Sequence, residues 1–223
     1  MQYGKIVSGE FISRPNRFIA NVNIDGKVQV CHVKNTGRCR ELLVPGATVY
    51  LEESDNPLRK TRYDLIAVYK GNILINMDSQ APNKIFGEWA KGYFAPDFIK
   101  PEVTYKNSRF DFYMEKGDEK IFVEVKGVTL EADGIASFPD APTERGIKHL
   151  FELSDAVKNG YTSYVFFIVQ MKGIKHFEPN RERHPEFCDA LKHAKDSGVT
   201  VMCLDCIVTP DSLTADKFVE VII

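Results

Sequence analysis

The chain lacks any hydrophobic stretch long enough to cross a membrane. Its longest apolar run, residues 164–169, is far shorter than the roughly 20 residues that a membrane-spanning helix needs. The first residues also lack the apolar core of a signal peptide. Cysteine is scarce, and five cysteines in 223 residues, an odd number, do not suggest a disulfide framework. We therefore expect a reduced, cytoplasmic protein with no membrane partner.

The common short catalytic and cofactor-binding motifs are absent as well. The sequence has no H-E-x-x-H, no G-x-G-x-x-G, no phosphate-binding P-loop and no G-x-S-x-G. One C-x-x-C is present, at Cys203 and Cys206, but it lies in a strand-like run, where residues three apart point to opposite faces. This pattern predicts two buried cysteines rather than a zinc site.

The composition that remains is that of an ordinary globular protein, with 43% apolar and 27% charged residues. The formal net charge is only −2, but the charge is unevenly distributed. Residues 1–80 carry 11 Lys and Arg against 8 Asp and Glu, whereas the remainder carries 18 against 23. A basic front part and an acidic back part are compatible with nucleic-acid binding at one end and a carboxylate metal site at the other.

Short strand-like runs separated by turn signals dominate residues 1–80. The strongest of these signals is Asp25-Gly26, which stands between two alternating runs and predicts a tight hairpin. About five short strands in this length favour a small antiparallel barrel of the OB type. Such barrels often bind nucleic acid on a basic, aromatic-bearing face.

Residues 35–42, N-T-G-R-C-R-E-L, are the best candidate in this part for contacts with nucleic acid. Arg38 and Arg40 supply guanidinium groups suited to phosphates, and Asn35 and Thr36 supply further hydrogen-bond donors. Arg14 with Arg17, and residues 59–62, form two further basic clusters in loops. The alternative for all three clusters is that they are solvated loop charges.

Residues 81–223 predict an α/β domain with a mixed sheet. Apolar residues at helical spacing from Ile85 onward predict a helix that ends near Gly92, which Asn83 or Ser79 would cap and which carries Glu88. The apolar run over residues 161–170 predicts a central buried strand, ending at Gln170. Further helices are expected over residues 143–157 and 185–198, followed by a strand over 199–208.

Two carboxylates and a lysine stand in adjacent strand-like runs of this domain. Asp111 lies in the run 110–114, and Glu124 and Lys126 lie two residues apart in the run 121–130. Residues two apart in a strand share a face, and the short intervening turn would let the two runs pair and bring Asp111 beside Glu124. Oxygen ligands of this kind suit Mg²⁺ or Mn²⁺, with Glu88 as a further candidate ligand. The alternative is a solvated Glu–Lys pair of little energetic consequence.

The arrangement D-x(n)-E-x-K resembles the PD-(D/E)XK nuclease superfamily. The proline of that pattern is missing, because Phe110 precedes Asp111. A helix that Asp140 or Thr143 would cap follows, and it carries Arg145, Lys148 and His149 in its first turns, where these side chains would reach a phosphate near Glu124. The alternative is a basic helix flank balanced by nearby acidic residues.

Four longer motifs resemble the sugar fermentation stimulation protein A (SfsA) family. They are N-T-G-R-x-x-E-L-L-x-P-G-A (35–47), S-D-N-P-x-R-K (54–60), V-E-V-K-x-V-T-L (123–130) and F-P-D-A-x-T-E-R-G-x-K-H-L (138–150). The resemblance covers nearly the whole chain, with Cys39 as a departure where methionine is more usual. It implies an OB-like domain over residues 1–80 joined to a nuclease-fold domain over 81–223. It also implies DNA binding without strong sequence specificity and a role in regulating sugar (maltose) metabolism genes.

Two functions follow as hypotheses. In the first, the protein is a metal-dependent phosphodiesterase acting on DNA, or on RNA, in which Asp111 and Glu124 hold Mg²⁺ or Mn²⁺ and Lys126 acts beside them. In the second, it is a DNA-binding transcriptional regulator that uses the nuclease fold only as a scaffold. Cleavage that depends on both the metal and Lys126 would separate the two.

Overall fold

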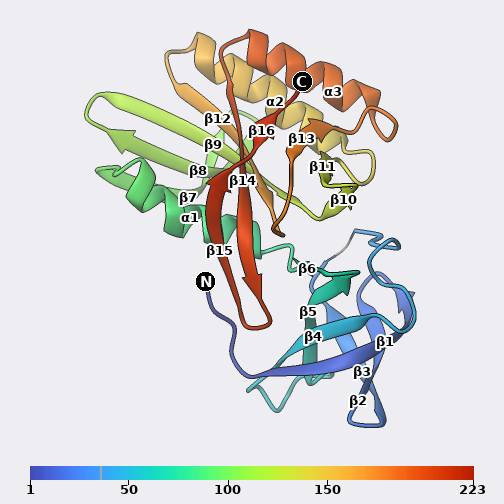
Figure 1. Cartoon of the computed structure of the whole chain (residues 1–223). Coiled ribbons are helices and arrows are strands. Elements are labelled where there is room, and N and C mark those ends of the chain that lie inside the picture. Colours follow the sequence, from blue (N-terminus) through green and yellow to red (C-terminus); the bar gives the residue numbers. More distant parts are fainter. Residues whose placement is uncertain (36) are drawn as a thin grey trace.

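The computed structural model of the protein describes residues 1–35 and 37–223. The chain folds into a small barrel followed by an α/β part, which lie next to each other in Figure 1. The last barrel strand ends at Asn76 and the first helix begins at Ala81. The division predicted at residue 80 falls in this short connection.

The barrel is built from strands that pair in the order β3-β2-β1-β4-β5, with β6 added beside β5. Their bounds are β1 Ile6–Asn16, β2 Ile19–Ile24, β3 Lys27–Val33, β4 Thr48–Glu53, β5 Tyr63–Lys70 and β6 Ile73–Asn76. Neighbours in this order are antiparallel, and a short parallel pairing of β3 with β5, at His32–Asp64 and Val33–Leu65, closes the barrel. The OB-like barrel expected from the turn spacing is therefore present.

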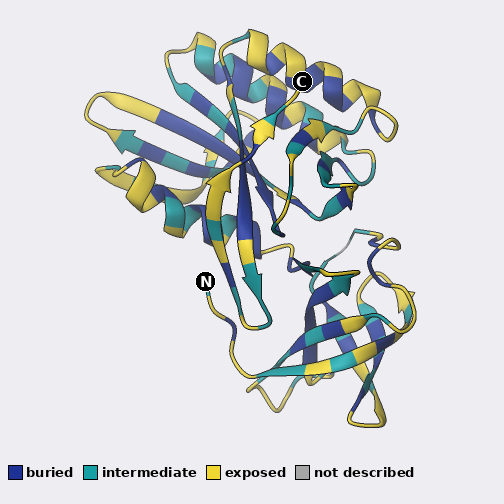
Figure 2. Ribbon diagram, in the orientation of Figure 1, coloured by how far each residue is buried: buried dark blue, intermediate teal, exposed yellow. Residues whose placement is uncertain are grey.

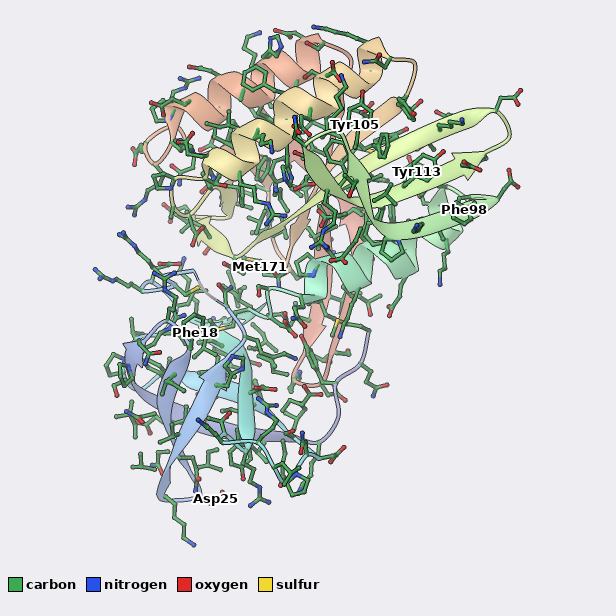
Figure 3. The ribbon with its side chains drawn as sticks, turned by 180° about the vertical axis from the view of Figure 1, so that it is seen from behind. Phe18, Asp25, Phe98, Tyr105, Tyr113 and Met171 are labelled. Carbon is green, nitrogen blue, oxygen red and sulfur yellow. The ribbon has the colours of Figure 1, made fainter. Side chains whose placement is uncertain are left out.

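The β2–β3 hairpin turns at the predicted dipeptide. Asp25 and Gly26 both have positive φ, at 50° and 79°, as the tightest two-residue hairpin turns require. Figure 3 shows Asp25 at the tip of the barrel far from the α/β part, whereas Phe18, at the start of the same hairpin, lies near the end that faces it. The hairpin thus spans the barrel from end to end.

The α/β part is organised around a six-stranded mixed sheet in the order β15-β14-β12-β9-β8-β7. Its strands are β7 Phe98–Tyr105, β8 Ser108–Lys116, β9 Glu119–Val128, β12 Thr162–Val169, β14 Thr200–Thr209 and β15 Ser212–Phe218. Strand β12 is parallel to both of its neighbours, and the outer pairs are antiparallel. The apolar run around residues 162–169 is thus the central buried strand that its composition predicted.

In the described part of the chain, three helices cover the two faces of this sheet: α1 Ala81–Tyr93, α2 Glu144–Lys158 and α3 Pro185–Asp196. Helix α1 packs on one face through Ile85 and Phe86, and α2 and α3 pack on the other through side chains such as Leu150 and Phe187. Figure 2 shows the middle of the sheet largely buried and the outer faces of the helices exposed, whereas the edge strands β7 and β15 are mostly exposed. Cys203 and Cys206 are both buried but belong to the separate cores on opposite faces, as their spacing predicted.

A second, small sheet of short strands lies beside α2 and α3, in the order β10-β11-β13-β16. These strands are β10 Leu130–Ala132, β11 Ile135–Phe138, β13 His176–Pro179 and β16 Glu220–Val221. The sequence pattern does not predict these strands, because runs of two to four residues show too little alternation to detect.

The first residues of the chain leave the barrel and attach to the α/β part. The backbone N–H of Tyr3 donates to the carbonyl of Asp211 at 2.8 Å, and Gln2 forms an isolated bridge with Ser212. The amino group of Met1 donates to the carbonyl of Leu213 at 2.8 Å. The barrel is therefore joined to the α/β part at its beginning as well as at its end. No helix in the described part of the chain combines the length and apolar character needed to cross a membrane.

Candidate functional site

Asp111 sits where two neighbouring strands of the sheet move apart. The backbone pairing of β8 with β9 ends at Phe112–Val123, one residue before Asp111 would meet Glu124. The carboxylate of Asp111 fills this opening, because its Oδ2 accepts a hydrogen bond from the backbone N–H of Val125 at 2.8 Å. Its Oδ1 accepts a second bond at 2.8 Å from the side-chain amide of Asn83 on α1. Both oxygens are thus oriented by the fold.

Asn83 was expected to cap α1 and does not. Gln80 occupies the N-cap position with no side-chain capping bond, and Asn83 lies inside the first turn. Ser79, the other expected cap, donates to the backbone carbonyl of Lys34 in the barrel at 2.8 Å. The amide of Asn83 serves Asp111 instead, a role that sequence spacing gives no means of finding because it depends on how α1 docks on the sheet.

Glu124 is buried and anchored through one oxygen. Its side-chain Oε1 accepts hydrogen bonds from the Lys126 ammonium and from Nδ1 of His149, each at 2.5 Å. Glu124 is only 3% exposed, and the Lys126 side chain is 15% exposed. A solvated Glu–Lys pair, the alternative considered for this strand, is not what the structure contains.

The two carboxylates have pKa values shifted in opposite directions. Burial raises the pKa of Asp111, and the nearby charge of Glu124 raises it further, against the hydrogen bonds from Val125 and Asn83. Burial also acts to raise the pKa of Glu124, but the charge of Lys126 and the bond from His149 outweigh it, so that this pKa is lowered. Two interacting carboxylates with divergent pKa values are typical of functional sites.

The second oxygen of Glu124 is the unusual atom of this cluster. Oε2 is buried and has no hydrogen-bond partner. A buried carboxylate oxygen without a donor is costly, and it is explained where a cation or a water takes that position. The donor set of Asp111 and Glu124 suits a hard divalent cation that retains several waters. Over residues 1–35 and 37–223, no group of three or more His, Cys, Asp or Glu side chains is placed to hold a metal ion by itself.

Glu88 does not join this cluster. Its carboxylate accepts from the amino group of Met1 at 2.8 Å, and the side chain is 60% exposed. No described contact links it to Asp111 or Glu124. Helical periodicity correctly predicted that Glu88 lies on α1. Its carboxylate pairs with the amino group of Met1 because residues 1–3 attach to the α/β part.

Helix α2 begins where the sequence predicted, with Thr143 as its cap: the hydroxyl of Thr143 accepts from the backbone N–H of Gly146 at 3.0 Å. Its first turns face a cavity of about 470 Å³, which is lined by Asn107, Ser108, Arg109, Glu144, Arg145, Lys148 and His149. The side chain of Lys148 donates to the carbonyl of Asn107 at 2.6 Å across this cavity.

His149 differs from the other two basic residues of the helix. It is 4% exposed, and it contacts Glu124 rather than facing the cavity as a free donor. Nε of Arg145 donates to the other ring nitrogen, Nε2, at 3.3 Å. The three residues predicted to bind phosphate are therefore close together, but one of them is held by the carboxylate cluster.

On the barrel side, the loop over residues 35–40 is organised by Arg14. The Arg14 guanidinium donates to the backbone carbonyls of Arg17, Asn35, Gly37 and Arg38 at 2.6–2.9 Å. Asn35 supports the same loop, since its side-chain oxygen accepts from the N–H of Gly37 at 2.7 Å. The side-chain oxygen of Asn35 thus holds the backbone of the loop, and Arg14, which looked like one more loop cation, donates to four backbone carbonyls through its two terminal nitrogens while its Nε has no described partner.

The loop lines a cleft of about 700 Å³ between the barrel and the α/β part. Arg17, Arg38 and Arg40 line it, and their side chains have no hydrogen bond or ion pair with any other residue that the structure describes. Thr36, predicted to bind nucleic acid with them, lies outside the described residues. The opposite wall includes residues 127–130 and Gln170, so the cleft runs alongside the strand end that follows Lys126.

Gly127 and Gln170 keep this wall close to the connection between the two parts. A Cβ on Gly127 would lie 2.6 Å from Cγ of Pro82 and 2.8 Å from Oε1 of Gln170, so only glycine fits. The Gln170 amide donates to the side-chain oxygen of Asn76 at 2.9 Å and to the carbonyl of Asp78 at 3.0 Å. Met171, the next residue, is buried at the junction of the two parts in Figure 3.

An OB-like barrel followed by a mixed-sheet α/β unit, with two carboxylates and a lysine on adjacent strands, defines the class of this protein. Family models separate the same two units: the SfsA N-terminal OB domain matches residues 12–77, and the sugar fermentation stimulation protein RE domain matches residues 80–212. The chain belongs to the sugar fermentation stimulation protein (SfsA) family, as its motifs suggested.

Relatives of the chain carry the same description along their full length. A sugar fermentation stimulation protein homologue from Desulfitobacterium hafniense is 63% identical over 99% of this chain and 98% of its own. One from Clostridium beijerinckii is 59% identical, with both chains covered completely. Among solved structures, SfsA of Pyrococcus furiosus in complex with Ca²⁺ matches with a TM-score of 0.88 and 26% identity, over 100% of this chain and 98% of that one.

Proposed function

We propose that this protein is a metal-dependent nuclease that cleaves phosphodiester bonds of DNA bound in the cleft between the barrel and the α/β part. The observation that carries the proposal is the cluster of Asp111, Glu124 and Lys126, in which a buried carboxylate oxygen has no protein partner. Sheet stability does not require such a cluster, because burying charges costs more than packing apolar side chains of the same size. The cluster therefore has a function, and the cleft beside it has the size and charge to admit a polynucleotide.

The proposed cation is Mg²⁺ or Mn²⁺, held by one oxygen of Asp111 and by Oε2 of Glu124. When bound, such an ion lowers the pKa of a coordinated water and offsets negative charge on the phosphate. That a relative of the same family forms a complex with Ca²⁺, another hard cation with oxygen ligands, supports a divalent-cation site in this chain.

The chain's own residues supply the remaining functions. Asn83 and the N–H of Val125 fix the carboxylate of Asp111 so that it needs no rearrangement to act as a ligand. The Lys126 ammonium would stabilise the charge that develops on the phosphate oxygens or orient the attacking water. Arg145 and Lys148 would bind a neighbouring phosphate from the first turns of α2, and Arg38 and Arg40 would hold the strand from the barrel side.

The test is cleavage of plasmid and of single-stranded DNA with Mn²⁺ by the wild type, by Lys126→Ala and by Lys120→Ala. Lys120 lies on the same strand but is exposed, so it is the matched control. We expect Lys126→Ala to lower the cleavage rate about 100- to 1,000-fold, the usual effect of removing one group that stabilises transition-state charge. Lys120→Ala should cleave like the wild type. An RNA of the same sequence, run in parallel, tells which nucleic acid is preferred.

The second candidate function is binding without cleavage, as a regulator of genes for sugar metabolism. One observation favours it: Lys126 is already paired with Glu124, and the site offers two carboxylates rather than three protein ligands. DNA binding at unchanged affinity in the wild type and in Lys126→Ala, with no cleavage in either under Mg²⁺ or Mn²⁺, would decide for this function. Under both functions the cytoplasm is the proposed compartment, since the five cysteines are free, buried thiols.

A further inference from the structure

We infer that His149 is a positioning residue of the cation site: it holds Oε1 of Glu124 so that Oε2 is presented to the cation. The inference rests on the proposed role of Glu124 as a ligand, and it replaces the phosphate contact that the sequence suggested for His149. Three observations carry it, namely the ring's contacts with its neighbours, the distribution of donors over the two oxygens, and the absence of a free ring nitrogen.

The contacts of the ring determine which nitrogen carries the proton. Nε of Arg145 lies 3.3 Å from Nε2 of His149, and a guanidinium nitrogen can only donate. Nε2 is therefore the acceptor, and in the neutral ring the proton is on Nδ1. Nδ1 lies 2.5 Å from Oε1 of Glu124, so His149 donates to the carboxylate. The ring of Phe110, next to Asp111 in the chain, packs edge-on against His149 at a centroid distance of 6.1 Å.

Both donors that reach Glu124 use the same oxygen. Lys126 and His149 each lie 2.5 Å from Oε1, from strand β9 and from helix α2, and Oε2 receives neither. A carboxylate gripped from two directions at one oxygen has little rotational freedom, and its other oxygen keeps a fixed direction. Outer partners of this kind orient the groups that bind a metal and tune their affinity.

His149 has no remaining capacity to act on a substrate. Both ring nitrogens have protein partners, and the residue is 4% exposed. Its effect must therefore pass through Glu124. Lys148, one residue earlier, projects instead into the cavity in front of α2 and is the natural control for a general effect of the helix.

The test measures Mn²⁺ affinity of the full chain by calorimetry without nucleic acid, so that phosphate contacts play no part. His149→Asn and His149→Gln are a matched pair, since the asparagine amide nitrogen takes the position of Nδ1 and the longer glutamine places its amide near Nε2. We expect His149→Gln and His149→Ala to weaken Mn²⁺ binding about 10- to 100-fold. His149→Asn should stay within about three-fold of the wild type, and Lys148→Ala should bind Mn²⁺ unchanged.

Each result separates this inference from the proposed function. If the wild type binds Mn²⁺ and the Asn and Gln variants bind it equally well, the inference is overturned while the cation site stands. If the wild type binds no Mn²⁺, the cation site itself is wrong and the inference falls with it. Thermal unfolding without metal identifies any variant that does not fold. If His149→Ala does not fold, the comparison of His149→Asn with His149→Gln still tests the inference, because both side chains are polar and close in size to histidine.

Discussion

The α/β part and the barrel use their charged residues near the cleft in opposite ways. On the α/β side, Asp111, Glu124 and His149 are buried or nearly so, and each is fixed by partners from other elements. On the barrel side, four arginines line the cleft, and only Arg14, on β1, is fixed by described partners, the backbone carbonyls of four residues. The carboxylates are therefore held in a defined geometry, whereas the side chains of Arg17, Arg38 and Arg40 have no described partner.

The comparison shows that residue type alone does not reveal what a charged side chain does. Arg14 and Arg17 look alike in the sequence, as do Lys148 and His149 in their positions on a basic helix. Arg14 donates to four carbonyls and His149 has a protein partner at each ring nitrogen, whereas the Arg17 side chain has no described partner and Lys148 donates to one carbonyl. Substitutions that compare a side chain held by several protein partners with one that has few or none therefore test this difference most directly.

The largest expected effect concerns the buried side of the comparison. Glu124→Ala removes the partner of Lys126 and of His149 at once, and breaking a buried ion pair from one side typically costs about 3–5 kcal/mol. We expect a loss of that size in the free energy of unfolding measured with urea, together with loss of Mn²⁺ binding. Glu53→Ala in the barrel, whose ion-pair partners Arg62 and Lys5 are exposed, should leave the free energy of unfolding nearly unchanged. Equal losses in the two variants would contradict the distinction between the buried and the exposed ion pair.

The next effect concerns the barrel side. Arg14→Lys keeps the positive charge but not the planar fork that reaches four carbonyls, so we expect the 35–40 loop to lose its shape. DNA affinity, measured by fluorescence anisotropy at one fixed salt concentration, should fall about tenfold. Arg40→Lys, at a side chain without a described partner, should change it by less than about two-fold. Similar affinities for both variants would mean that the loop acts through its charge alone.

The smallest effect follows from the raised pKa of Asp111. Because burial and the charge of Glu124 raise this pKa in the folded state, the folded protein holds the Asp111 proton more tightly than the unfolded chain does. The contribution of Asp111 to stability therefore decreases as the pH rises through that raised pKa, from the ordinary value of 3.8 upward. Asparagine keeps only one of the two acceptor oxygens, so the pH trend is the test: without metal, the melting temperature of the wild type should rise relative to that of Asp111→Asn as the pH falls from 7 toward 4.

Added Mn²⁺ provides the control for this prediction. A ligand that binds only the folded state stabilises it, and the wild type should gain this stabilisation while Asp111→Asn should not. Saturating Mn²⁺ is then expected to raise the melting temperature of the wild type at pH 7 and to leave that of Asp111→Asn unchanged. A difference between the two metal-free melting temperatures that stays constant from pH 7 to pH 4 would show that the Asp111 charge is not costly in the fold.

Local patterns were enough to predict the framework of both parts. Asp25-Gly26 predicted its hairpin because the turn depends on two residues, and residues 162–169 predicted a central strand because only burial on both faces tolerates such a run. The contact between Lys126 and Glu124 has a similarly local cause, since strand geometry puts residues two apart on one face.

The contacts that complete the site depend on how distant segments dock, and the sequence carries little trace of them. His149 reaches Glu124 across 25 positions, Asn83 reaches Asp111 across 28, and the amine of Met1 reaches Glu88 across 87. The sequence marks His149, Asn83 and Glu88 as polar or charged, but it predicts their roles from their immediate neighbours, and it gives no signal for the amine of Met1. The role of Arg14 was missed for the same reason, because its acceptors are backbone atoms with no sequence signature.

The attachment of residues 1–3 to the turn and strand around Asp211 has a mechanical consequence. The barrel is attached to the α/β part at two places, through residues 1–3 and through the connection over residues 76–81. The attachment through residues 1–3 prevents a free rotation of the barrel about that connection. The gap between the two walls is thereby kept near one width, and a polynucleotide would have to enter it from an open end rather than wait for the walls to separate. A bulky extension fused ahead of Met1 would loosen the attachment of residues 1–3, and with it the spacing on which both walls depend.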